Sequence, residues 1–313
     1  MKRLILLSVL VAAAALSMAV AQAPPAIIGI KLVKVRANLY IITGGREKPA
    51  EGGIAGNTTV FVADSGVVLV DTKYPGYGKT ILDQVRSITG KPVTTIVNTH
   101  THADHTGGNT DFLRTIEFVV QENTRANMAR MDGFKGDNAA FLPKRTFKDR
   151  LSLLSGKDRI DLYYFGKGHT DGDTVLHFPA LRVAVMGDLF ARKWAPLCDA
   201  MYGGSMIAYP QTLQKAADAL KDVDTIITGH ATTTHGTGRG TTFTASNPLM
   251  KPADLQEYAE FMRAFVAAAE AAMKAGKNVE AAAANLNLPA KFKDYDMAQA
   301  KADVQRVYDE LKR

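Results

Sequence analysis

The 313-residue sequence has a single cysteine, Cys198, so no disulfide can form within the chain. The fold therefore has to be held by its hydrophobic core, for which a chain of this length is ample. Histidine is also scarce, with seven residues, and tryptophan occurs once. No cluster of lysine and arginine interleaved with aromatic residues occurs, which argues against a nucleic-acid-binding protein.

Apolar runs long enough to cross a membrane are absent after the first residues of the chain. At the N-terminus, Lys2 and Arg3 precede an apolar stretch from Leu4 to about Leu16, and Ala19-Val20-Ala21 has the small residues of a cleavage site. Residues 1–21 therefore predict a secretory signal cleaved after Ala21, with an uncleaved membrane anchor as the alternative. The mature chain is expected to be periplasmic or secreted, without stable membrane insertion.

Three of the seven histidines stand within six residues, in the run His100-Thr101-His102-Ala103-Asp104-His105. In an extended segment, side chains two positions apart point to the same side, so His100 and His102 can bind one metal ion. Asp104 and His105 follow where the backbone is expected to turn, and they can bind a second ion beside the first. The alternative is a surface loop that is rich in histidine by chance.

Apolar periodicity predicts an α/β protein with many short strands. Alternation predicts a hairpin from Ile27 to Ile41 and strands over 58–63, 66–70, 93–97, 118–121, 160–164, 174–178, 181–186 and 225–228. Helical spacing predicts helices over 79–88, 122–131, 211–220, 255–269, 279–284 and 297–311. Gly107 and Gly108 are expected to permit a turn, and Asn109 to cap a further short helix. Residues 232–247 read as a loop, and 44–53 and 132–148 as loops that are candidate flaps over the site.

Four more residues of metal-binding type occupy similar positions along the chain. Asp71, Asp188 and His230 each follow directly on a predicted strand, and His169 lies in a glycine-rich turn between two strands. This recurrence predicts one shared site where the strands end. Taken alone, Asp71 is equally consistent with a turn residue and with a support for metal-binding histidines.

In this order, the motifs resemble those of the metallo-β-lactamase superfamily over roughly residues 35–232. The resemblance implies an αββα sandwich, two mixed β-sheets flanked by helices, which we expect in residues 22–250, with 251–313 as a helical extension packed on the same domain. It implies that His100, His102 and His169 bind a first metal ion, that Asp104, His105 and His230 bind a second, and that Asp188 bridges both. Nitrogen and oxygen ligands of this kind suit two zinc ions, with iron or manganese as alternatives.

The surroundings of His100 and His169 are similar to those in zinc β-lactamases of the cysteine-ligand subclass. That subclass carries cysteine where Asp188 stands here, and usually arginine where His105 stands. Cys198 comes ten residues too late to substitute for the missing cysteine. An aspartate at 188 with a histidine at 105 instead resembles lactonases and glyoxalase-II-like thioesterases.

The resemblance implies a hydrolase in which a hydroxide shared by two zinc ions attacks the carbonyl group of the substrate. The bond that is opened would be that of an ester, lactone, thioester or amide, and the amides could include β-lactams. Asp104 would coordinate the second ion and orient this hydroxide. No serine or cysteine nucleophile is required, so Cys198 and Ser205 are expected to be structural. The substrate is expected to be a small molecule.

Residues near the predicted ligands have less defined roles. Arg192 and Lys193 follow Asp188 closely enough to hold a substrate carboxylate, with solvated surface charge as the alternative. His177 and His235 lack a motif, and we expect neither to be a ligand. Two other functions remain open at this point: an iron-dependent redox enzyme such as a sulfur dioxygenase, and a non-catalytic binder of metal or ligand. The sequence does not indicate the oligomeric state.

Overall fold

The computed structural model describes residues 30–45, 54–235, 242–245 and 247–312. The predicted signal sequence and most of the predicted loop 44–53 lie outside this part. The first sheet has seven strands in the order of the chain: β1 (Lys31–Lys34), β2 (Leu39–Thr43), β3 (Thr58–Val62), β4 (Val67–Val70), β5 (Val93–Val97), β6 (Glu117–Gln121) and β7 (Arg145–Phe147). Strands β1 to β4 pair antiparallel, and β4 to β7 pair parallel.

A second sheet of six strands has the order β15-β12-β11-β10-β9-β8. Its members are β8 (Arg150–Leu153), β9 (Ile160–Tyr164), β10 (Thr174–Phe178), β11 (Val183–Val185), β12 (Thr225–Ile227) and β15 (Leu249–Met250). Only the β11–β12 pair is parallel among the pairs of this sheet. A separate antiparallel pair is formed by β13 (Thr232–His235) and β14 (Thr242–Ala245).

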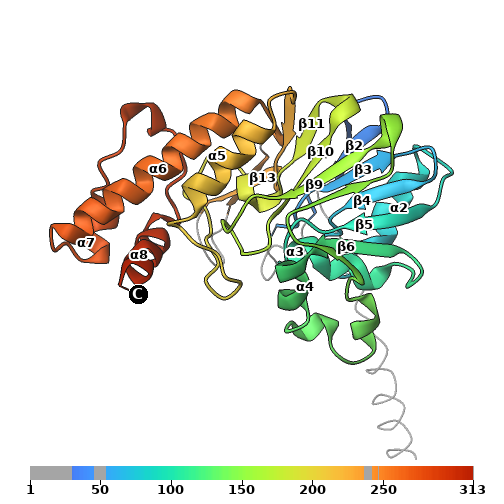
Figure 1. The fold of residues 1–313 in the computed structure, drawn as a ribbon, viewed down its shortest axis with the longest axis horizontal. Helices are drawn as coiled ribbons and strands as arrows, with labels where there is room; N and C mark the ends of the chain where they lie inside the picture. The colour runs from blue at the N-terminus through green and yellow to red at the C-terminus, as the bar shows by residue number, and fades with distance from the viewer. Residues whose placement is uncertain (1–29, 46–53, 236–241, 246, 313) are drawn as a thin grey trace, which may run out of the picture.

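The longer helices lie on the outer faces of the two sheets (Figure 1). The α-helices are α2 (Gly78–Arg86), α3 (Ala103–Thr106), α4 (Glu122–Met128), α5 (Tyr209–Ala219), α6 (Pro252–Lys274), α7 (Val279–Ala284) and α8 (Ala300–Leu311). Short 3-10 helices include η1 (Gly107–Asp111), η2 (Asp132–Phe134), η3 (Gly136–Phe141), η4 (Gly156–Asp158), η5 (Pro179–Leu181), η6 (Gly187–Phe190) and η8 (Ala290–Phe292). Among the described residues, no helix is both long and apolar enough to span a membrane.

The alternation of side chains along each strand divides the core into three layers. In β4, Val68 and Val70 pack between the sheets, while Val67 and Leu69 pack on the outer face against α2. The outer face of the second sheet packs against α5, α6 and α8 in a third cluster. This arrangement is the predicted αββα sandwich of two mixed sheets, and it carries a helical C-terminal region.

The structure differs from the sequence-based expectation at a few elements. Strands β7 and β8 were not expected, because each is short and begins with an exposed arginine. Residues 232–235 and 242–245 form paired strands rather than a loop, since threonine favours extended backbone. The helix after the histidines begins at Ala103 rather than after Asn109.

Asn109 is buried inside η1 and caps nothing. Its side chain instead exchanges hydrogen bonds with the amide of Asn98 and accepts one from the hydroxyl of Thr72. The neighbouring glycine is required by close packing rather than by a turn, since a Cβ atom on Gly108 would lie 2.1 Å from the carbonyl oxygen of Thr72.

Candidate metal centre

The predicted ligands converge where several strands of both sheets end. β5 leads into His100 and His102, and Asp104 and His105 lie in the first turn of α3. The other three come from segments that follow strands of the second sheet. They are His169 between β9 and β10, Asp188 in η6 after β11, and His230 after β12.

One group of three histidines, His100, His102 and His169, forms the first candidate site. Their ligating nitrogens lie within 4.8 Å of one another. His169 Nε2 is 2.9 Å from His102 Nδ1, and the three rings stand roughly perpendicular to one another. Three nitrogens brought this close fit the ligand set of a single metal ion.

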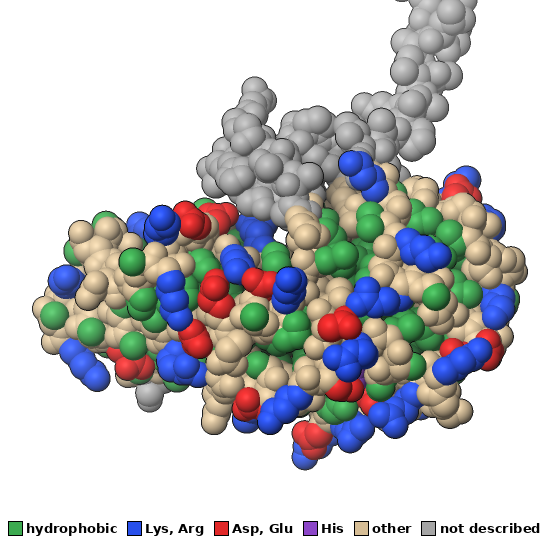
Figure 2. All heavy atoms as spheres, turned by 90° about the horizontal axis from the view of Figure 1, so that it is seen from above, with side chains coloured by type: hydrophobic (Ala, Val, Ile, Leu, Met, Phe, Trp, Pro, Cys, Tyr) green, Lys and Arg blue, Asp and Glu red, His purple; other side chains and the backbone are tan. Residues whose placement is uncertain are grey.

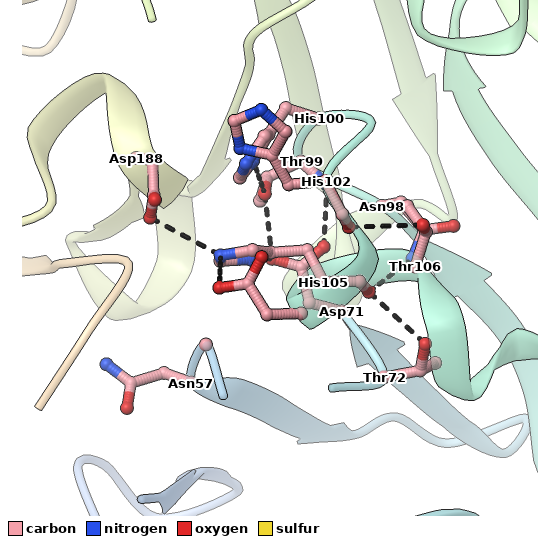
Figure 3. Close-up of polar contacts among 12 residues, drawn as sticks. Asn57, Asp71, Thr72, Asn98, Thr99, His100, His102, His105, Thr106 and Asp188 are labelled. Carbon is pink, nitrogen blue, oxygen red and sulfur yellow. Dashed lines mark hydrogen bonds and ion pairs between the residues drawn. The ribbon is translucent and has the colours of Figure 1, made fainter. Parts of the chain in front are cut away.

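A second group is formed by Asp104, His105 and His230. Asp104 Oδ2 lies 3.4 Å from the Nε2 atoms of both histidines, and these two nitrogens are 3.4 Å apart. Asp188 stands between the groups, with Oδ2 3.2 Å from His230 Nε2 and 3.7 Å from His169 Nε2. In Figure 3 Asp188 points from its helical turn toward the ring of His105. This placement suits a carboxylate shared by two ions.

The protonation of these side chains also fits a metal centre. Burial lowers the pKa of His100 well below its ordinary value and lowers the pKa of His169 to about 4, with the neighbouring imidazoles adding to both shifts. Both rings are therefore neutral near pH 7 and keep a lone pair. His100 Nε2 is buried and has no hydrogen-bond partner within the described part of the chain, an arrangement that a metal ion would resolve.

The carboxylates of the site are ionised. Burial alone would raise the pKa of Asp188, but His230 and His105 hold it well below the ordinary value. Burial opposes ionisation of Asp104 in the same way, and His105 and His230 again lower its pKa. The neutral imidazoles of His100 and His169 therefore lie beside ionised carboxylates. Burial alone would lower the pKa of His105, but Asp104, Asp188 and Asp71 raise it well above its ordinary value. Histidine nitrogen and carboxylate oxygen are both zinc ligands.

Asp71 contacts His105 of the candidate site. Its Oδ2 atom is 2.8 Å from His105 Nδ1, and the carboxylate also accepts hydrogen bonds from the backbone N–H and the hydroxyl of Thr99. The Thr99 hydroxyl in turn lies 3.1 Å from His100 Nδ1. Asp71 thus leaves Nε2 of His105 free to face the site. These contacts are the geometry expected of a residue that supports metal-binding histidines, and that role stays a prediction.

Two supports for the first group were not found from the sequence. His102 Nε2 lies 2.7 Å from Asp199 Oδ2, and His169 Nδ1 hydrogen-bonds the carbonyl oxygen of Leu197. Both partners come from residues 197–199, which have no apolar periodicity and no sequence motif. Every residue has a backbone carbonyl oxygen, so the sequence cannot show which of them contacts a histidine. Only the three-dimensional structure reveals these contacts.

The side of the site next to His105 is formed by Gly56 and Lys73. A Cβ atom on Gly56 would lie 2.3 Å from the His105 ring, so only glycine fits there. Lys73 is fully buried, and its ammonium group donates to the carbonyl oxygens of Ile42, Gly44 and Gly56 at 3.0, 2.8 and 2.5 Å. Lys73 therefore links Ile42 and Gly44, at the end of β2, to Gly56 beside the His105 ring.

A cleft of about 460 Å³ lies beside His102. Its lining comes from the segment before α2, from α3 and η1, from the turn after α4 with η2 and η3, and from the 199–204 turn. The lining residues are Pro75, Ala103, Gly107, Thr110, Arg130, Met131, Asp132, Gly133, Phe134, Asn138 and Tyr202. The Tyr202 ring contacts the His102 ring at 5.6 Å, and the Arg130 guanidinium lies 6.0 Å from the Tyr202 ring. The start of the predicted flap 132–148 thus borders a cleft next to the candidate centre.

The candidates for substrate binding after Asp188 pair with residues of the C-terminal region instead, Lys193 with α6 and Arg192 with Asp296 at 3.7 Å. Lys193 forms ion pairs with Asp254 and Glu257 of α6 at 2.7 and 3.1 Å. The Arg192 guanidinium lies 3.9 Å from the centre of the Trp194 ring. These contacts favour a structural role over the predicted binding of a substrate carboxylate.

The remaining sequence candidates lie away from the ligand cluster. His177 is on β10, with Nε2 3.5 Å from Asp222. The hydroxyl of Ser205 donates to Glu310 of α8, and burial raises the pKa of the Cys198 thiol, so neither is an activated nucleophile. The side chain of His235 lies outside the described ones.

With this geometry in place, comparison with known proteins identifies the family. A family model of the metallo-beta-lactamase superfamily matches residues 52–240, more than half of the chain. The chain belongs to this superfamily. The match includes all seven candidate ligands and ends before α6.

The names of known relatives give two different activities. A type 2 metallo-beta-lactamase from Elizabethkingia meningoseptica is 29% identical over 160 residues, which are 50% of the chain and 61% of that relative. The alpha subunit of a 2,4-dinitroanisole O-demethylase from Nocardioides sp. (strain JS1661) is 31% identical over 157 residues, 49% of the chain and 44% of that relative. The chain thus matches less than two thirds of the length of either relative.

The fold has a close counterpart among solved structures. A metallo-beta-lactamase from Pontibacter korlensis superimposes with a TM-score of 0.60 at 19% identity, over 75% of the chain and 99% of that structure. At this identity the likeness concerns the fold. Members of the superfamily typically bind metal ions, and the His/Asp groups described above are where this chain would do so.

Proposed function

We propose that this protein is an exported, dinuclear zinc-dependent hydrolase of a small ester, lactone, thioester or amide. The observation that carries the proposal is the convergence of seven histidine and aspartate side chains on two adjoining positions. His100, His102 and His169 would hold one ion, and Asp104, His105 and His230 the other, with Asp188 between them. Zinc ions held there would supply Lewis acidity toward a carbonyl oxygen and an activated water.

The protein's own side chains have distinct tasks in this proposal. Asp104 is ionised and borders both histidines of its group, so it can accept and return the proton that moves during hydrolysis. Asp71 and Asp199 hold His105 and His102 in the tautomer that presents the ligating nitrogen. The cleft between Ala103 and Tyr202 is placed to receive the substrate beside the first group.

The relatives supply substrate classes for a test. Their names point to β-lactam hydrolysis and to O-demethylation of 2,4-dinitroanisole, an aryl methyl ether with an activated leaving group. Esters, lactones and thioesters expel oxygen or sulfur, which leave more readily than the nitrogen of an amide. Asp188 places an oxygen ligand where the β-lactamases of the cysteine-ligand subclass have sulfur, and we therefore rank oxygen and sulfur leaving groups above nitrogen.

Metal content and turnover test the proposal together. Protein purified without added metal is analysed for zinc, iron and manganese, and is then assayed against lactones, aryl esters, thioesters, β-lactams and dinitroanisole. We expect two zinc ions per chain and hydrolysis of oxygen or sulfur esters. In the His100→Ala variant we expect the zinc content to fall and the hydrolysis to be lost. The Asp64→Asn variant, at an exposed turn, is the matched control. Bound iron with oxygen consumption would favour a redox enzyme instead, and metal binding without any turnover would favour a binding protein.

A further inference from the structure

The C-terminal helix α8 contacts the segment that orients the first histidine group. Residues 197–206 form this segment, here named the Asp199 segment. Three polar residues of α8, Asp303, Arg306 and Glu310, are spaced so that they lie along one face of the helix. Each of them contacts the Asp199 segment. Figure 1 shows α8 beside α6 and α7, at the C-terminal end of the molecule.

The contacts along this face are short and largely buried. Arg306 Nη2 donates to the carbonyl oxygen of Gly204 at 2.7 Å. The carboxylate of Glu310 accepts hydrogen bonds from the Ser205 hydroxyl at 2.5 Å and from the Met206 backbone N–H at 2.9 Å. Arg306 and Glu310 also pair with each other at 3.1 Å, with about one seventh of each side chain exposed, 14% and 13%. The third residue, Asp303, has its pKa raised well above the ordinary value by burial, and the backbone N–H of Cys198 opposes this shift.

The other side of the Asp199 segment meets the metal-binding histidines. Besides the contact of Asp199 with His102 and of the Leu197 carbonyl with His169, the backbone N–H of Asp199 donates to the carbonyl oxygen of His169 at 2.9 Å. Gly204 closes the turn by donating to the Asp199 carbonyl at 2.8 Å. A Cβ atom on Gly204 would lie 2.4 Å from the His169 carbonyl oxygen, so the turn packs directly on this histidine.

We propose that α8 is a positioning element of the metal centre, which fixes His102 and His169 through the Asp199 segment. This inference rests on the proposed metal-binding function. It assigns a role to a part of the chain that lies outside the family match at residues 52–240. The reason is the packing of the Asp199 segment: it orients two ligands of one ion, and it is itself hydrogen-bonded to Arg306 and Glu310 of α8.

The test is a metal titration of the full-length protein and its Glu310→Gln variant. Zinc affinity is measured by competition with a chelator, and cobalt(II) absorption reports the coordination of each ion. We expect about tenfold weaker binding of one of the two ions, the lower end of the effect of losing an outer partner of a metal ligand, and near-normal binding of the other. The cobalt spectrum should change in the same way in Asp199→Asn.

The control is Asp309→Asn on the same helix, which neutralises an adjacent carboxylate that is exposed. It should leave both affinities and the spectrum unchanged. If Glu310→Gln folds poorly, Arg306→Lys is titrated in its place, with a smaller selective loss expected. Equal weakening of both ions, or wild-type affinities in Glu310→Gln and Arg306→Lys, would overturn the inference and leave the proposed function intact. Failure of the wild-type protein to bind metal would contradict the proposed function itself.

Discussion

His105 Nδ1 lies 2.8 Å from Asp71 Oδ2, and both side chains are almost completely buried. The Asp71→Asn variant keeps the shape of this pair but loses the negative charge and the certainty that Nδ1 is the protonated nitrogen. We expect metal affinity of the second group and turnover to fall about 10- to 100-fold. Chelator competition and kcat/KM measure the two effects. Asp64→Asn, at an exposed ion pair with Lys157, should change neither, and unchanged affinity in Asp71→Asn would contradict the support role.

Lys73 predicts a pH dependence of folding stability. Burial lowers its pKa to about 7, against the opposing charges of Asp71 and Asp104, while the pKa of an unfolded lysine is about 10.4. Between these values the unfolded chain binds one more proton than the folded chain, so the free energy of unfolding rises with pH. The slope approaches about 1.4 kcal/mol per pH unit. Below pH 7 the lysine is charged in both states and adds no slope.

The Lys73→Met variant removes this proton and three hydrogen bonds to buried carbonyl oxygens. It should therefore be less stable overall, and it should lack the rise in stability between pH 7 and 10. Urea unfolding of the metal-free protein across this range measures the difference. Lys79→Met, at an exposed side chain, provides the reference. A rise of equal slope in wild type and Lys73→Met would show that other groups cause it.

A substitution in the cleft beside His102 is expected to change substrate binding, measured as KM, without changing the chemical step, measured as kcat. Arg130 is exposed at its rim and retains hydrogen-bonding capacity beyond its contacts with Asn127 and Met201. Arg130→Gln should raise KM for substrates with a carboxylate three- to tenfold, on the order of 1 kcal/mol, while leaving kcat nearly unchanged. The Lys135→Gln variant, which removes a cation outside the cleft lining, should behave as wild type. Equal KM values for anionic and neutral substrates in Arg130→Gln would rule out this contact.

The order of ligands along the chain could be predicted because most of them lie just beyond a strand. Strand ends on one side of a sheet meet at one edge, so Asp188 and His230 come together although 42 positions separate them. The supports from Asp199 and Leu197 could not be predicted, because they depend on how an aperiodic segment packs against α8. The same limit explains Lys193, whose partners are on α6 and not at the site.

Charges of opposite sign are mixed on the surface of the protein. On the face shown in Figure 2, lysine and arginine side chains are interspersed with aspartate and glutamate. Ion pairs such as Arg145 with Glu117 and Lys291 with Glu260 also bring opposite charges together on the surface. Positive charge is therefore not gathered into one patch on this face. That nucleic acid is not a partner stays a prediction from the sequence.

Asp188 predicts the preference among leaving groups. Its carboxylate lies between the two groups of candidate ligands and offers oxygen where the cysteine-ligand β-lactamases have sulfur. The expelled nitrogen of a β-lactam needs more stabilisation than an alkoxide or a thiolate, so wild type should hydrolyse lactones or esters with a higher kcat/KM than β-lactams. Asp188→Cys should shift this ratio toward β-lactams, since the softer sulfur ligand alters the second group. The two kcat/KM panels, measured with metal content matched, decide the matter. Strong β-lactam turnover by wild type without lactone turnover would show that the leaving-group argument is wrong, because the oxygen ligand would then be no obstacle to expelling nitrogen.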